Sequence, residues 1–104
     1  MQRKVIKNAS EFFDLRCPAD VLVRRSAVLE ILKQLDDRGL QVYGMEGGPL
    51  FSDGSYMLKM ASCFDKKIMT GDPGSAGVIN NLAIESLKED PPEWDVYELR
   101  VTEV

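Results

Sequence analysis

A glycine-rich turn that runs directly into a helical pattern is the feature that most constrains the fold of this chain. Residues 70–77 read Thr-Gly-Asp-Pro-Gly-Ser-Ala-Gly, and residues 78–89 then repeat apolar side chains at helical spacing. The apolar stripe consists of Ile79, Leu82, Ala83 and Leu87. Neither Pro91 nor Pro92 can continue a helix. The sequence therefore predicts one helix over residues 78–89, opened by the turn and closed before the prolines.

The clearest strand pattern follows that helix. Apolar Tyr97, Leu99 and Val101 alternate with polar Glu98, Arg100 and Thr102. Strict alternation places one set of side chains on each face of a strand. We expect one face of this strand in the core and the other in water.

The first half of the chain predicts a strand, a short helix and a longer helix. Residues 3–7 alternate around Val5, and a helix start capped by Asn8 or Ser10 follows. The buried side of this short helix would hold Phe12, Phe13 and Leu15. Residues 26–38 predict the longer helix, with Gly39 as its stop.

Residues 19–25 allow two interpretations. The longer helix begins near residue 19, or residues 20–25 form a strand that precedes a helix capped by Ser26. We favour the helix, because Val21 and Val28 would lie on one face two turns apart.

The middle of the chain predicts strands separated by turns. Residues 40–45 are rich in strand formers, and Gly47, Gly48 and Pro49 predict a turn after them. Residues 52–55 read Ser-Asp-Gly-Ser, a second turn signal. Strands are expected over residues 56–64 and 68–70.

These elements predict an α+β fold in which residues 1–104 form a single domain. The expected order is βαββαβ, the ferredoxin-like order, with an antiparallel sheet of about four strands and two main helices on one face. Residues 3–7 or 20–25 supply the opening strand, and the additional material at residues 8–25 is an N-terminal extension to this order. Folds of this kind occur in proteins with many unrelated functions, so the expected fold does not predict a function.

Composition narrows the classes of function. The chain has a net charge of −4, and its Lys and Arg residues are scattered among more numerous carboxylates, which disfavours nucleic-acid binding. Its apolar runs are far shorter than the ~20 residues that span a bilayer. No charged start is followed by an apolar leader, so we expect a cytoplasmic protein without membrane contact.

Residue types for catalysis and metal binding are sparse. The chain has no histidine, the commonest general base, and no cofactor is expected. Cys17 and Cys63 do not form a C-x-x-C pair, and we expect free, buried thiols. The turn aspartates do not follow the calcium-loop spacing, so we expect no metal site. A small enzyme is the third hypothesis, with Cys63 beside Lys66 and Lys67 as its only candidate nucleophile.

The first hypothesis is a non-catalytic binding or adaptor module that acts through protein–protein contact. Phe51 lies in a turn-rich loop and Trp94 follows two prolines, and aromatic side chains in loops are frequent interface anchors. The alternative is that both side chains fold back and seal the core. The acidic charge is compatible with an inhibitor-like or immunity-like protein that masks a basic target. The open edges of the expected sheet are compatible with a homodimer, in which one copy covers the edge of the other.

The second hypothesis is a sensor of a small anionic metabolite. The backbone N–H groups at a glycine-rich helix start converge on one point that can hold an anion. The residues that would form this site are Gly71, Gly74, Ser75, Ala76 and Gly77. The spacing matches neither common phosphate-loop motif, no lysine follows, and Asp72 would repel an anion.

Overall fold

The computed structural model describes residues 4–15, 21–58 and 76–103. Four strands and three helices lie within these residues. In chain order they are β1 (Val5–Ile6), α1 (Ala9–Phe13), β2 (Leu22–Arg24), α2 (Arg25–Gln34), β3 (Leu40–Gly48), α4 (Ala76–Glu89) and β4 (Val96–Glu103). In this part of the chain, no helix combines the length and apolar character needed to cross a membrane.

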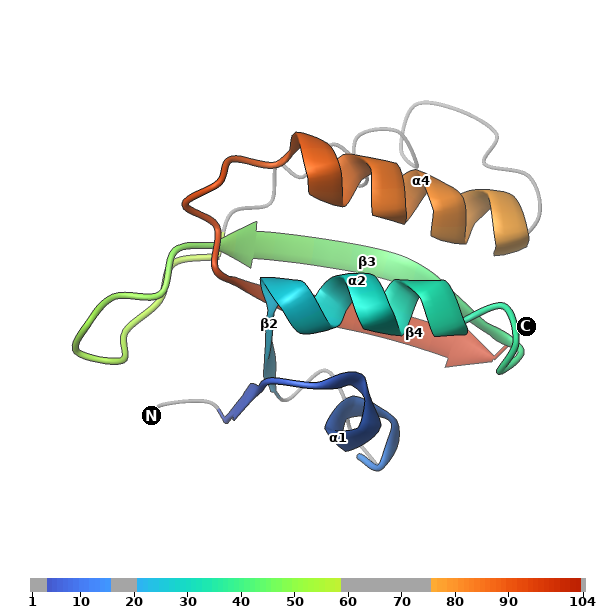
Figure 1. The fold of residues 1–104 in the computed structure, drawn as a ribbon, viewed down its shortest axis with the longest axis horizontal. Helices are drawn as coiled ribbons and strands as arrows, with labels where there is room; N and C mark the ends of the chain where they lie inside the picture. Colours follow the sequence, from blue (N-terminus) through green and yellow to red (C-terminus); the bar gives the residue numbers. More distant parts are fainter. Residues whose placement is uncertain (1–3, 16–20, 59–75, 104) are drawn as a thin grey trace.

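The strands form one sheet in the order β1-β2-β4-β3. Strand β4 is antiparallel to both of its neighbours, and β1 is parallel to β2. Helices α2 and α4 lie side by side over one face of the sheet (Figure 1). The α+β class and the two main helices on one face are confirmed.

The fully antiparallel sheet and the ferredoxin-like order are not confirmed, because the sheet is mixed. The sheet differs from the predicted one because of residues 8–25, the segment that the ferredoxin-like order leaves as an N-terminal extension. Residues 8–25 contain α1 and β2, so the connection from β1 to its parallel neighbour β2 includes a helix. A parallel pair requires such a crossover connection.

The N-terminal helix begins as its sequence predicts. Asn8 has an extended backbone and its Oδ1 accepts a hydrogen bond from the Glu11 N–H at 2.9 Å. This bond satisfies one of the unpaired donors of the first helical turn. Phe12 is buried, and Phe13 packs edge-to-face against it. Asn8 is therefore the cap, and Ser10 lies inside the helix.

The helix that we expected from residue 19 is wrong, because residues 22–24 form β2 and α2 begins at Arg25. Leu22 and Val23 are both completely buried, so this strand has no wet face that would show period-two alternation. A short, fully buried strand and a buried helical turn have the same apolar pattern. The helix also ends earlier than the predicted residue 38, because α2 stops at Gln34, and Gly39, with φ of +68°, closes the turn of residues 35–39 that follows it.

The turn expected at Gly47 and Gly48 is also wrong, because both residues belong to β3. A Cβ on Gly47 would overlap the Tyr97 ring and approach Trp94 Cε3 to 2.8 Å. A Cβ on Gly48 would overlap the Met57 carbonyl. The glycines permit close approach within a strand. The chain reverses instead at residues 52–55, where Gly54 has φ of 88°.

The core lies between the sheet and the helices. Tyr97 and Leu99 of β4 are completely buried, which confirms the alternation predicted for the last strand. Ile79, Ala83 and Leu87 of α4 are buried in the same cluster, and Leu82 packs against it. The strand expected at 68–70, most of the strand at 56–64, and both cysteines lie outside the described residues.

Candidate functional site

Three residues of the expected anion site, Gly71, Gly74 and Ser75, lie outside the described residues, and Ala76 and Gly77 open α4. A carboxylate lies beside that helix start. Asp36 Oδ2 would be 3.7 Å from a Cβ on Gly77, and Asp36 Oδ1 accepts a hydrogen bond from Asn80 Nδ2 at 2.7 Å. A negative charge stabilises a helix N-terminus. The chain therefore supplies an acidic group of its own next to the predicted site.

Trp94, the second expected interface anchor, lies in the core with 5% of its surface exposed. Its ring packs against Tyr97 at a centroid distance of 6.3 Å and an interplanar angle of 61°. Trp94 therefore folds back and seals the core, as the alternative interpretation of this residue predicts. Its side chain is not available as a surface anchor.

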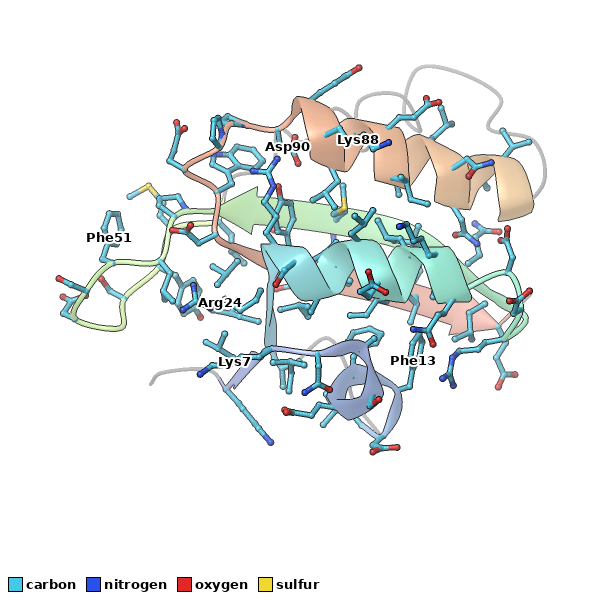
Figure 2. All side chains as sticks on the ribbon, viewed as in Figure 1. Lys7, Phe13, Arg24, Phe51, Lys88 and Asp90 are labelled. Atoms are coloured by element: carbon cyan, nitrogen blue, oxygen red, sulfur yellow. The ribbon has the colours of Figure 1, made fainter. Side chains whose placement is uncertain are left out.

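Phe51, the other expected anchor, lies on a hairpin formed by residues 49–57. The Phe51 N–H donates to the Ser55 carbonyl at 2.7 Å, and the Met57 N–H donates to the Pro49 carbonyl at 3.3 Å. Phe51 is 47% exposed and Met57 is 56% exposed. Figure 2 shows Phe51 on this hairpin, outside the packed body of the domain. Two large apolar side chains are thus displayed on a hydrogen-bonded support.

The hairpin tip carries a negative charge. Asp53 Oδ1 accepts hydrogen bonds from the Ser55 N–H at 2.9 Å and the Ser55 hydroxyl at 2.6 Å. These bonds, the hydroxyl bond first, hold the pKa of Asp53 below its ordinary value. The tip therefore remains anionic at neutral pH, next to the exposed apolar pair.

The base of the hairpin is tied to the loop of residues 91–95. The Asp95 N–H donates to the Gly48 carbonyl at 3.0 Å, and the Asp95 carbonyl accepts from the Arg25 N–H at 3.0 Å. Asp95 therefore joins the end of β3 to the start of α2. Glu93 in the same loop is exposed and carries a second negative charge.

Arg25 holds that loop in place. Its Nη2 donates to the carbonyls of Leu87 at 2.6 Å and Asp90 at 3.0 Å. Its Nη1 donates to the carbonyls of Pro91 at 2.6 Å and Trp94 at 3.4 Å. One guanidinium thus satisfies carbonyls at the end of α4 and in the following loop. This role cannot be predicted from the sequence, because nothing in the local pattern distinguishes Arg25 from Arg24.

A buried polar pair lies beneath the same loop. The Tyr97 hydroxyl donates to Asp90 Oδ2 at 2.9 Å. Burial, reinforced by the charge of Asp90 and by this bond, raises the pKa of Tyr97 far above its ordinary value, and Arg25 opposes the shift. The phenol therefore keeps its proton and acts as a fixed donor to Asp90.

Within the described ranges, no group of three or more Cys, Asp or Glu residues is placed to hold a metal ion. The sequence matches no known protein family and none of the curated proteins with which it was compared. The geometry alone therefore carries the functional argument.

Proposed function

We propose that the protein is a non-catalytic binding module that docks on another protein through the hairpin of residues 49–57. The observation that carries this proposal is the exposure of Phe51 and Met57, each with about half of its surface in water. Aromatic and methionine side chains are enriched at interfaces and supply much of their binding energy. Hydrogen bonds within the hairpin and at its base reduce the ordering cost of binding.

The negative charge at the hairpin tip and the acidic balance of the chain favour a basic partner. Asp53 lies at the tip, Glu93 is exposed in the loop that is bonded to the hairpin base, and the whole chain has a net charge of −4. Complementary charge accelerates association and orients the two surfaces. The proposed partner therefore offers an apolar pocket for Phe51 within a basic rim, as a target masked by an inhibitor-like protein would.

Site-specific photo-crosslinking in cells tests this proposal. One protein carries a photoreactive phenylalanine analogue at position 51, and the control carries it at Tyr43, which is 52% exposed on β3. We expect one abundant basic protein to be linked from position 51 only. Phe51→Ser in the purified protein should remove binding of that partner without changing the unfolding midpoint. Equal labelling from both positions, or none from position 51, would refute the proposed site.

A further inference from the structure

A second feature, separate from the hairpin, lies where the start of α2 meets the end of α4. A hollow of about 490 Å³ is lined there by Arg25, Ser26, Leu29, Leu87 and Lys88. Its volume falls within the ~300–1,000 Å³ range of small-molecule sites. Leu29 and Leu87 supply an apolar floor, and the two cations and the Ser26 hydroxyl supply the rim. The hollow therefore combines apolar contact with positive charge.

The positive charge of this hollow is not cancelled by carboxylate contacts of its lining residues. All four acceptors of the Arg25 guanidinium are neutral carbonyl oxygens. Within the described part of the chain, Lys88 forms no ion pair. Figure 2 shows Lys88 on α4 and Asp90 just beyond the end of that helix. Asp90 is 5% exposed and its Oδ2 accepts from Tyr97, so this carboxylate lies beneath the surface.

The amino end of α2 adds to the positive electrostatic potential of the hollow. Its N-cap residue, Arg24, makes no side-chain capping bond, and no acidic residue lies in its first turn. The partial positive charge of a helix start is therefore left without a negative side chain of its own helix. Ser26, in that first turn, lines the hollow.

We propose that this hollow binds an amphipathic monocarboxylate, with its alkyl or aryl body on Leu29 and Leu87 and its carboxylate beside Lys88. A single negative charge fits best, because the Arg25 donors are occupied by carbonyls and Lys88 is the remaining cation of the lining. A phosphate dianion requires several converging donors, which the lining residues do not offer. This binding site is independent of the hairpin and of the protein partner proposed above.

Calorimetric titration of the full chain tests the proposal with octanoate and 4-phenylbutyrate, and with octan-1-ol as an uncharged comparison. We expect one molecule of carboxylate per chain and much weaker binding of the alcohol. Lys88→Glu should weaken carboxylate binding about 3- to 10-fold, because it replaces an attraction at a partly exposed site by a repulsion. The matched control is Lys33→Glu, the same charge change at an exposed residue in the last turn of α2.

A second variant separates binding from folding. Ser26→Glu adds a carboxylate at the rim of the hollow and in the first turn of α2, where a negative charge stabilises the helix. We expect weaker carboxylate binding together with an unchanged or higher unfolding midpoint. The proposal is overturned if neither carboxylate binds, if octan-1-ol binds as tightly as octanoate, or if Lys33→Glu weakens binding as much as Lys88→Glu.

Discussion

Replacing Arg25 by methionine should cost this small domain a large share of its stability. The substitution keeps most of the aliphatic stem and removes a guanidinium that donates to four carbonyls. Hydrogen bonds to charged groups contribute about 1.5–3 kcal/mol each, although bonds from one side chain do not add. Carbonyls near the surface regain water when the donor is lost. We therefore expect the free energy of unfolding to fall by about 2–4 kcal/mol.

Denaturant titration measures this change, with the fluorescence of Trp94, the only tryptophan of the chain, as the probe. Trp94 is buried, so its emission should shift when the domain unfolds. At about 4–8 °C per kcal/mol, the thermal midpoint should fall by about 8–32 °C. Arg24→Met is the matched control, since no hydrogen bond of the Arg24 side chain is found among the described residues, and it should change stability by less than about 0.5 kcal/mol. Equal midpoints for the two variants would refute the role given to Arg25.

Four further substitutions and a pH titration test the packing and the polar pairs. Gly47→Ala should destabilise the protein by about 1–3 kcal/mol, because the methyl group would overlap the Tyr97 ring. Gly77→Ala should be neutral or stabilising in the same denaturant assay, because its Cβ would make only an ordinary contact with Asp36 Oδ2 at 3.7 Å. Asn80→Leu should cost about 2–4 kcal/mol by the same measurement, because it leaves the buried Val42 N–H without its 3.0 Å acceptor. Tyr97 should stay protonated above pH 10 in the folded protein, whereas a tyrosine of the unfolded chain ionises there. The free energy of unfolding should therefore fall as the pH rises above about 10, by up to about 1.4 kcal/mol per pH unit. Ultraviolet titration of the folded protein should therefore show Tyr97 ionising only as the domain unfolds, and Tyr97→Phe should remove this component.

The elements that the sequence predicts correctly are those whose two sides differ in polarity. Strand β4 alternates between buried apolar and partly exposed polar side chains over residues 97–100, and α4 has one buried stripe. The Asn8 cap acts within one turn of its own helix, so it too is visible locally. In each case the information lies within a few neighbouring residues, which is the range over which sequence patterns operate.

The elements that the sequence predicts wrongly depend on distant partners. Strand β2 is paired on both edges and buried on both faces, and its strand character comes from β1 and β4. Gly47 and Gly48 look like a turn because glycine is common there, yet aromatic side chains and the Met57 carbonyl require their lack of a Cβ. Asn80 also acts at a distance, because its amide pairs with Leu40 and Val42 of β3.

The candidate interaction site shows the same division. Phe51 was visible as an aromatic residue in a turn-rich loop, whereas Met57 emerges only from its exposed position on the hairpin. Trp94 is buried instead, because Gly47 has no side chain and so leaves room for the Trp94 ring. The sequence pattern therefore identifies the two aromatic residues, and tertiary packing decides which of them is exposed.

Asp95 joins the base of the hairpin to the helical layer. Its N–H binds Gly48 at the base of the hairpin, and its carbonyl binds the first N–H of α2. Arg25 fixes the same loop from its other side through the carbonyls of Pro91 and Trp94. The hairpin base is therefore continuous with the helical layer, while Phe51 itself contributes little to the core. Loss of Arg25 should consequently lower stability and partner binding together, whereas loss of Phe51 should lower partner binding alone.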